Sequence, residues 1–510
     1  MKNVKKGVYN ALSRLGGTWL TKEQVTILAK RMGITPESVY GSKDIVTYNG
    51  LYTLKEIAEV ENEIALNLMQ LSRLSRPQKA DEVVIRQLIK KFEKEENDGY
   101  ELHFHQVDAV IMVVNNSFSI LTGGPGTGKT TVLRAIAYVL RALYKGISIA
   151  YAAPTGKAAR RCTESTGEYA CTGHKKLGLG RDGENAHVIP VQEDVLFMDE
   201  SSMNDIFLTA ALSKAIKGDK RLVFVGDVDQ LPSVGLGAVL RDLIASRVVP
   251  VTMLTHTFRQ DNSSTLFSNI CKTREGKSDF EKGDDFLPLE IEKGKDSVQH
   301  CIDLICSQYK EKVQKYGIDN VVCLLPYRRE KGSRCCANVL NNEIQKMLNP
   351  CKQGFRHTDM DGNVRMFMLN DPVMQLDNRT ECVNGDVGKI VAVSESGVSV
   401  QYADNLVKYS PSELNELTLA YAMTIHKSQG SEYSCVIMAL LDEHSAMLQR
   451  NLVYTGITRA KKEVVLDYQK DALEKAVKTV AEDSRITLLS EKMQSLAAQY
   501  RMAYGIDVVA

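Results

Sequence analysis

The residues of a phosphate-binding loop stand together at Leu121–Thr131. The pattern is Gly-x-x-x-x-Gly-Lys-Thr, which follows an apolar, strand-like stretch and precedes a stretch with helical periodicity. A strand that leads through a glycine-rich turn into a helix directs several backbone N–H groups and the positive end of the helix dipole at one point. We therefore predict a nucleoside triphosphate site in which Lys129 reaches the terminal phosphates and the Thr130 hydroxyl holds Mg²⁺. The loop residues of this site are Gly123, Gly124, Pro125, Gly126, Thr127, Gly128, Lys129, Thr130 and Thr131.

Polar groups that suit nucleotide hydrolysis follow three further apolar stretches. Asp199 and Glu200 come directly after Val195–Met198, where Asp199 would hold Mg²⁺ through water and Glu200 would orient and deprotonate the attacking water. The alternative is a strand followed by an acidic helix cap. Gln230 would sense the γ-phosphate, and Arg259 is a candidate arginine finger because it accompanies these motifs.

Strands and helices alternate around these motifs and predict how the side chains are positioned. The pattern indicates a doubly wound parallel sheet in the α/β class. Ligands of such sheets bind beyond the carboxyl ends of the strands, which is where the motifs fall. The predicted strands are 117–121, 148–153, 195–198, 221–225 and 251–254.

The chain after residue 262 predicts a second α/β domain that is interrupted by a different kind of structure. A buried strand at 320–325 is followed, at 351–415, by short strands with frequent turn residues, which favour a small antiparallel barrel. The parallel pattern then resumes at 417–421, and residues 470–510 are predicted to be helical.

The first 95 residues predict helices, a hairpin and a long helix, an order that resembles a small winged-helix-like module. A capping box at Thr21–Gln24 begins one helix, and Asn49-Gly50 is a hairpin turn. The module could read DNA or serve as a scaffold that docks a partner protein. The predicted domains are 1–95, 96–262 with a small hairpin at about 175–190, 263–350 together with 416–510, and the barrel at 351–415.

Composition limits the class of protein without naming its function. A chain of 510 residues predicts several domains, and a net charge of +1 neither favours nor excludes binding to nucleic acid. No apolar run approaches the ~20 residues of a membrane span, and Lys2, Lys5 and Lys6 are not followed by the apolar core of a signal peptide. The 11 cysteines include no Cys-x-x-Cys pair, so we expect reduced thiols in the cytoplasm.

Taken together, the motifs resemble a RecD-like superfamily 1B DNA helicase over roughly residues 100–470. The stretches that carry the resemblance, in helicase order, are Gln106, Gly123–Thr131, Ala153–Ala159, Thr172–His174, Met198–Glu200, Gly226–Pro232, Phe258–Gln260, Ala420–Glu432 and Val453–Ala460. The resemblance implies two RecA-like domains of the P-loop NTPase type, ATP and Mg²⁺ as cofactors, and an SH3-like insertion at 351–415.

The resemblance also implies roles for single residues. Gln106 would read the adenine edge and Phe258 would pack against the base, while Gly430 and Glu432 would complete the nucleotide site, with Glu432 near the ribose. Arg259 and Arg459 would be fingers on the γ-phosphate from opposite sides of an interdomain cleft. The single-strand track would be lined by Thr155, Lys157, His174, Thr424, His426 and Lys427. One departure is Gly173, where relatives usually carry an apolar residue.

The length of one segment bears on the direction of movement. About 35 residues separate Ala153–Ala159 from Val195–Glu200, and relatives that move 3′-to-5′ carry large helical insertions there. The resemblance therefore implies 5′-to-3′ movement, with the 175–190 hairpin as a strand-separating pin; the alternative for that segment is an ordinary surface loop.

Three functions remain open at this point. The first is an ATP-dependent helicase that moves 5′-to-3′, the second a single-strand translocase that strips proteins without processive unwinding, and the third a non-catalytic, ATP-gated DNA-binding subunit. The complete set of catalytic candidates argues against the third. The expected partners are single-stranded DNA, duplex junctions and a protein bound through the N-terminal domain, for a monomeric motor in a bacterial or phage-infected cytoplasm. The pathway stays open among repair, recombination and replication.

Overall fold

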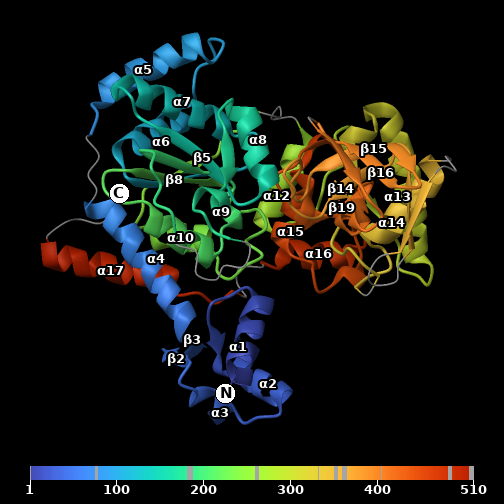
Figure 1. Ribbon diagram of the computed structural model, residues 1–510, viewed down its shortest axis with the longest axis horizontal. Coiled ribbons are helices and arrows are strands. Elements are labelled where there is room, and N and C mark those ends of the chain that lie inside the picture. The colour runs from blue at the N-terminus through green and yellow to red at the C-terminus, as the bar shows by residue number, and fades with distance from the viewer. Residues whose placement is uncertain are drawn as a thin grey trace. The chain divides into compact units, whose positions relative to one another are not determined.

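The computed structural model describes residues 2–74, 79–180, 188–258, 264–330, 332–349, 354–358, 364–403, 405–480 and 485–504. Contacts divide the chain into two units (Figure 1). The first holds residues 1–259 and 481–510, and the second holds residues 260–480. Each unit contains its own parallel sheet, so the predicted α/β class with two parallel-sheet units is confirmed.

The sheet of the first unit has six parallel strands in the order β6-β5-β7-β8-β4-β9. Five of them lie where the sequence predicts a strand. The sixth, β6, is not predicted because three residues are too few to show an alternating pattern. The strands are β4 (Phe118–Gly123), β5 (Ile149–Ala153), β6 (Ala170–Thr172), β7 (Val195–Met198), β8 (Arg221–Gly226) and β9 (Val251–Leu254).

Helices cover both faces of this sheet, because successive side chains of a strand point to opposite faces. Leu121 and Phe197 lie in the core formed with α5, α6, α7 and α8, whereas Ile120 and Met198 lie in the core formed with α10 and α11. The helices are α5 (Glu82–Glu95), α6 (Phe104–Asn115), α7 (Lys129–Leu143), α8 (Gly156–Thr166), α9 (Gly173–Lys176), the 3₁₀ turn η1 (Ser201–Met203), α10 (Ile206–Ala215) and α11 (Val239–Ser246).

The N-terminal module has the predicted order of elements. Thr21 and Gln24 form the expected capping box, and the β2–β3 hairpin turns at Asn49 and Gly50, both in the left-handed region. The module is not a separate body, however, because α4 packs on α10 and shares the core beneath the first sheet. Its elements are α1 (Lys2–Leu15), β1 (Leu20–Thr21), α2 (Lys22–Met32), α3 (Pro36–Tyr40), β2 (Ile45–Tyr48), β3 (Leu51–Leu54) and α4 (Lys55–Leu74).

The second unit is built on a five-stranded parallel sheet in the order β10-β21-β20-β11-β19. The edge strand β10 is not predicted from the sequence, because Pro288 in its middle disfavours a strand except at a sheet edge. The elements are α12 (Thr265–Glu275), β10 (Phe286–Glu290), α13 (Ser297–Tyr316), η2 (Ile318–Asn320), β11 (Val321–Leu325), α14 (Ala337–Leu348), β19 (Ala422–Thr424), η4 (Ile425–Ser428), β20 (Tyr433–Leu440), η5 (Asp442–His444), α15 (Arg450–Ile457), β21 (Ala460–Tyr468) and α16 (Lys470–Lys478).

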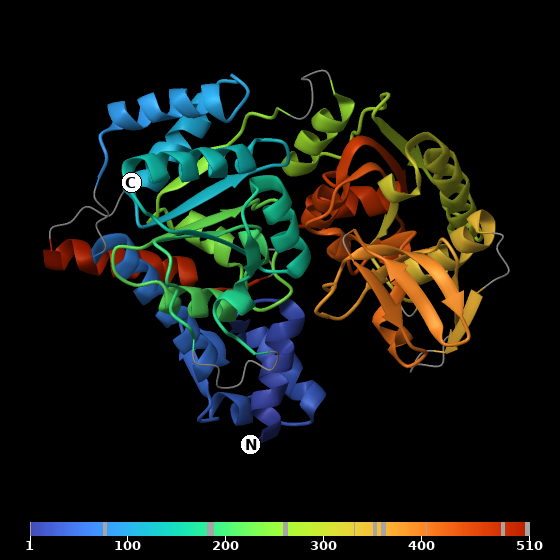
Figure 2. The same ribbon diagram turned by 45° about the horizontal axis from the view of Figure 1, so that its top comes forward.

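An antiparallel insertion interrupts the second unit, and Figure 2 shows its strands in yellow and orange. It extends past the predicted end at residue 415, because Val373 pairs with Leu419 and so joins β18 to this sheet. Closure into an SH3-like barrel stays a prediction. The strands are β12 (Gly354–Thr358) and β13 (Val364–Met368), which form a hairpin, and β14 (Pro372–Gln375), β15 (Val387–Ser394), β16 (Gly397–Gln401), β17 (Leu406–Tyr409) and β18 (Leu417–Leu419), with the turn η3 (Glu413–Glu416) between the last two.

The last helix, α17 (Leu489–Tyr504), belongs to the first unit. It packs against α4 and α11, and Leu489 and Met493 lie in the core beneath the first sheet (Figure 1, red). The prediction that 416–510 as a whole belongs to the second domain is therefore wrong beyond residue 480. The apolar face of the helix was predicted, but the surface that covers it was not.

Two findings concern the described part of the chain as a whole. Within it, no helix is long and apolar enough to cross a membrane. The ten cysteines that the structure describes are all free thiols.

Candidate active site

The phosphate loop connects β4 to α7 at the carboxyl end of the first sheet. Gly126 and Gly128 have positive φ angles of 74° and 80°, which favour glycine. A Cβ atom on Gly128 would lie 2.3 Å from Nε2 of Gln106. Gly128 is also the N-cap of α7, so no side chain covers the first N–H groups of that helix. The loop thus presents backbone donors at a helix start, as an anion site requires.

The ammonium group of Lys129 lies inside this loop. Its Nζ donates to the carbonyl oxygens of Gly123 at 2.6 Å and Gly124 at 3.0 Å. The Thr127 hydroxyl donates to the same Gly124 oxygen at 2.8 Å. Neutral oxygens therefore hold the Lys129 ammonium at the loop. The oxygens of a bound phosphate can take their place as partners of this charge.

Two side chains predicted to contact the base meet at the loop from distant positions. Nε2 of Gln106 donates to the carbonyl oxygen of Thr127 at 3.1 Å, while its Oε1 accepts from the His103 N–H at 3.0 Å in a capping box of α6. Phe258 donates its backbone N–H to Gly126 at 2.8 Å, and its side chain is 53% exposed. An exposed aromatic ring beside a phosphate loop is available to a base.

Sequence reasoning missed the histidines beside Phe258. The rings of His103 and His256 stack with centroids 4.7 Å apart, and His256 meets Phe258 edge-on, also at 4.7 Å. Burial lowers the pKa of His103, and the neighbouring His256 and His105 lower it further. The two histidine rings support Phe258. Because His103 and His256 come from separate loops, no spacing in the sequence indicated that they stack.

The two predicted carboxylates follow β7. Burial, together with the charge of Glu200, raises the pKa of Asp199 to about 6, while the bond from the Glu200 N–H and the charge of Lys129 oppose the rise. The Asp199 carboxylate accepts the Glu200 N–H at 2.9 Å. Glu200 itself has a φ of 50°, a strained angle for a residue with a side chain, and such strain gathers at functional sites.

Gln230 is held at the end of the neighbouring strand, β8. Its Nε2 donates to Oδ2 of Asp227 at 3.1 Å, and both side chains are buried. Burial raises the pKa of Asp227, and Lys129 lowers it. Lys129 therefore acts electrostatically on a carboxylate from each of two adjacent strands, so the structure brings the loop lysine and both acidic strand ends together.

The predicted DNA contacts have structural partners of their own. Thr155 caps α8 by accepting the Ala158 N–H at 3.2 Å, and Thr424 caps η4 by accepting the Lys427 N–H at 3.3 Å. Each hydroxyl keeps its proton for donation. Nζ of Lys427 donates to Asn384 at 2.7 Å, and burial lowers the pKa of this lysine.

Gly173 is buried, and the His174 that follows it is exposed. A Cβ on Gly173 would lie 3.1 Å from Met198 and 3.2 Å from Leu208, so tight packing explains the departure noted in the sequence. An exposed His174 at this position stays available for contact with a ligand.

Arg459 and Glu432 lie in the second unit. Arg459 is 3% exposed, and its guanidinium donates to Thr455 at 3.1 Å, Thr458 at 3.3 Å and Ser431 at 3.4 Å, all neutral oxygens. Glu432 pairs with Lys461 at 3.4 Å. The predicted finger Arg259 lies outside the described residues, as does the 181–187 part of the predicted hairpin.

Comparison with known proteins shows the family to which this chain belongs. The model of the AAA domain matches residues 106–236, and that of the UvrD-like helicase C-terminal domain matches residues 419–466. The chain is 31% identical to the RecBCD enzyme subunit RecD of Mycolicibacterium smegmatis over 411 residues, which cover 72% of this chain and 70% of that subunit. The chain belongs to the RecD-like family of superfamily 1B helicases.

Other relatives of this RecD-like chain differ in length. It is 34% identical to the ATP-dependent RecD2 DNA helicase of Deinococcus radiodurans over 360 residues, which are 70% of this chain and 47% of that protein. The chain thus spans about half the length of that relative. Among solved structures, the Pif1 helicase from Candida albicans is similar with a TM-score of 0.45 and 18% identity, covering 78% of this chain and 100% of that one.

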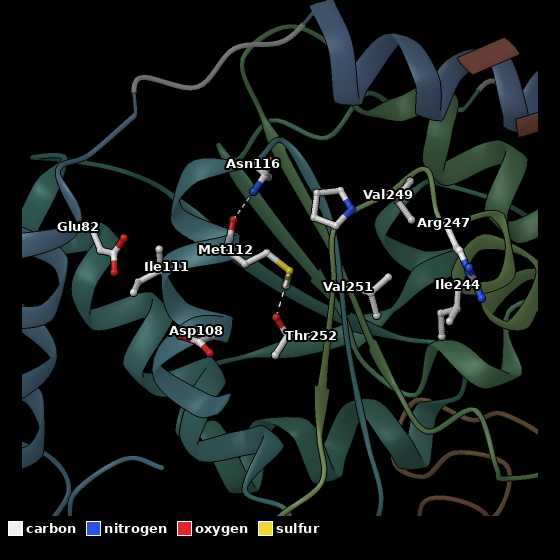
Figure 3. Close-up of a pocket in the computed structure, with 11 residues that line it drawn as sticks. Glu82, Asp108, Ile111, Met112, Asn116, Ile244, Arg247, Val249, Val251 and Thr252 are labelled. Atoms are coloured by element: carbon white, nitrogen blue, oxygen red, sulfur yellow. Dashed lines mark hydrogen bonds between the residues drawn. The ribbon is translucent and has the colours of Figure 1, made fainter. Parts of the chain in front are cut away.

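The RecD-like chain also has a hollow of about 630 Å³ at the opposite end of its first sheet (Figure 3). It lies where α6 ends and β9 begins, and Met112 points toward Thr252, whose hydroxyl donates to its sulfur at 3.2 Å. Because β9 runs parallel to β4, this end is remote from the phosphate loop. The hollow is therefore separate from the nucleotide site.

Proposed function

We propose that this chain is an ATP-dependent DNA helicase that moves 5′-to-3′ along single-stranded DNA. The observation that carries the proposal is the placement of Lys129, which lies inside the phosphate loop and acts on the buried carboxylates Asp199 and Asp227. A site that concentrates opposite charges around a helix start suits the binding and hydrolysis of a nucleoside triphosphate.

The chemistry assigns one role to each group. The loop N–H groups and Lys129 bind the phosphates, and Gln106 and Phe258 hold the base. Glu200 orients a water, takes its proton as the oxygen attacks the γ-phosphorus, and ADP and inorganic phosphate leave. Gln230 loses its γ-phosphate partner at that moment and reports the change to the adjoining loop.

Thr130 and Asp199 fit a Mg²⁺ site. Hydroxyl and carboxylate oxygens are the ligands that this ion prefers, and Asp199 is a buried acid whose pKa of about 6 a nearby cation would lower. Bound there with ATP, the ion would neutralise charge on the phosphates. The described residues contain no cluster of three or more metal-binding side chains, which agrees with an ion held chiefly by nucleotide and water.

The second unit would supply the finger Arg459, and Arg259 would act from the first. Arginine suits the role because its planar fork pairs with the charge that develops on the transferring phosphoryl group. Gly430 and Glu432 would complete the nucleotide site. The described contacts of Arg459 hold its buried guanidinium against the oxygens of Thr455, Thr458 and Ser431.

The DNA track would combine hydroxyl, imidazole and ammonium donors from both units. Single-strand binding needs contacts to the phosphate backbone without base readout, and such donors provide them. The 5′-to-3′ direction is supported by the short connection between α8 and β7, whose described residues form β6 and α9 and which carries the predicted pin. A docking role for the N-terminal module stays a prediction, as do the cytoplasmic location and the monomeric state.

The experiment that tests this function is unwinding of DNA duplexes that carry a single-stranded tail at either the 5′ or the 3′ end, with ATP and Mg²⁺. We expect ATP-dependent unwinding of the 5′-tailed duplex only. A translocase without unwinding would instead displace streptavidin from a biotinylated single strand and leave both duplexes intact. Strand separation from the 3′ tail alone would contradict the proposed direction.

A further inference from the structure

Three segments that are far apart in the sequence meet beneath the loop that carries Gln230. They are Gly16–Gly17 after α1, Gly235–Gly237 in the loop between β8 and α11, and Arg485–Thr487 ahead of α17. Nη1 of Arg485 donates to the carbonyl oxygen of Gly237 at 2.9 Å. The Gly237 N–H donates to the carbonyl oxygen of Gly16 at 2.8 Å. Both backbone groups of Gly237 are thus held by partners from outside its own loop.

Close packing makes this junction specific. A Cβ on Gly16 would lie 2.6 Å from Cζ of Arg485, so the guanidinium lies directly against that glycine. A Cβ on Gly237, whose φ is 97°, would lie 2.6 Å from Ile206. Side chains at either position would displace the arginine or the loop.

A short path joins Gly237 to Gln230. The Ser233 hydroxyl donates to the carbonyl oxygens of Gly235 at 3.1 Å and Gly237 at 3.4 Å. Ser233 is the third residue after Gln230, which is bonded to Asp227 at the end of β8. The loop is therefore fixed to the sheet at its beginning and to Arg485 at its end.

The segment that carries Arg485 is itself firmly attached to the N-terminal module. The Ile486 carbonyl accepts the N–H groups of Thr18 at 2.9 Å and Trp19 at 3.0 Å. Lys492 pairs at 2.9 Å with Glu61, which is fully buried. The chain leaves the second unit at residue 480, so Arg485 stands at the point where the chain returns to the first unit.

We propose that Arg485 is a positioning residue for ATP hydrolysis. By holding Gly237 it keeps the 227–237 loop, and with it Gln230, in the arrangement that senses the γ-phosphate. It also ties that loop to the stretch of chain that arrives from the second unit. This inference rests on the proposed function in that it assigns Gln230 to nucleotide sensing.

The test compares Arg485→Ala with Arg14→Ala in the full-length chain. Arg14 is an exposed arginine at the end of α1, two residues before Gly16, so the control removes the same charge near the same junction. Arg485→Lys is the conservative variant, and it replaces Arg485→Ala if that protein fails to fold. Hydrogen–deuterium exchange measures the loop directly, and steady-state kinetics measure DNA-stimulated ATPase.

In Arg485→Ala we expect exchange in residues 228–237 to rise about tenfold while exchange in 123–131 stays unchanged. We expect kcat to fall about tenfold with the KM for ATP within about twofold of wild type, because the base and phosphate contacts are untouched. Arg485→Lys should lie between wild type and Arg485→Ala in both measurements, and Arg14→Ala should match wild type.

Unchanged exchange in 228–237 would overturn the inference, and so would a rise in the KM for ATP as large as the loss in kcat, which would indicate general damage to the site. A wild-type protein without DNA-stimulated ATPase would contradict the proposed function, whereas the exchange measurement would still decide whether Arg485 holds the loop.

Discussion

Nε2 of Gln106 lies 3.1 Å from the carbonyl oxygen of Thr127, so the side chain predicted to read the base is bonded to the phosphate loop itself. The same amide group that would bind the base therefore also holds the backbone of the phosphate loop. We expect Gln106→Ala to raise the KM for ATP about tenfold, the scale of one lost hydrogen bond, and to reduce the preference for ATP over GTP. Steady-state ATPase with both nucleotides measures this. If the preference for ATP over GTP in these kinetics is unchanged, Gln106 supports the loop and does not read the base.

Lys129→Ala removes the ammonium that would compensate the terminal phosphates. We expect DNA-stimulated ATPase to fall at least ~100-fold, the scale of losing a preorganised charge at a reacting group. Circular dichroism should report a normal fold. The matched control is Lys145→Ala, an exposed lysine just after α7, which should behave as wild type. Near-normal turnover in Lys129→Ala would contradict the assignment of this stretch as the phosphate-binding loop.

Glu200→Gln keeps the shape of the side chain and removes the basic oxygen. We expect turnover to fall about 100-fold or more, the usual scale for a general base, while ATP and single-stranded DNA still bind. Fluorescent nucleotide and oligonucleotide titrations measure the binding. If ATP binding is lost and residual turnover stays high, Glu200 has a structural role at its strained backbone angle.

The predicted pin begins and ends at one place in the fold. The Ile189 N–H donates to the carbonyl oxygen of Leu177 at 2.9 Å, and Leu179 and Val188 pack against the core. Replacing only residues 180–187 with a short Gly/Ser linker therefore spares the packing. We expect DNA-stimulated ATPase to persist and unwinding of a 5′-tailed duplex to be lost. Retained unwinding would mean that another element, such as the antiparallel insertion, parts the strands.

Asp467 predicts a pH dependence of stability. It is fully buried on β21, Gln308 donates to its Oδ1 at 2.9 Å, and burial raises its pKa to about 7. Because the folded state binds this proton more tightly than the unfolded state, the contribution to stability is full below pH ~4 and is lost as the pH rises through about 7. The shift corresponds to about 4 kcal/mol.

Asp467→Asn should remove that dependence. We expect the Tm of Asp467→Asn, relative to that of the wild type at the same pH, to rise between pH 5 and pH 8. Differential scanning fluorimetry measures both values. The exposed Asp471, whose pKa is lowered by its bond to Lys293, supplies the control Asp471→Asn. A difference in Tm that does not change with pH would show that Asp467 is ionised throughout.

The sequence by itself determined the local features of this chain. The order strand, glycine loop and helix around Lys129, the capping box of Thr21 and Gln24, and the bounds of β7 and β9 all appear as predicted. These features depend on backbone preferences and on contacts within a few residues, which the amino-acid types specify directly. The family relationship follows from the same short motifs.

Tertiary structure alone decided which distant segments meet. The stacking of His103 on His256, the bond from Arg485 to Gly237 and the return of α17 to the first unit join residues that no periodicity relates. The strands β6 and β10 likewise depend on neighbours, since one is too short and the other contains a proline. An amphipathic pattern states which face of a helix must be buried; the packing of the whole chain selects the surface that buries it.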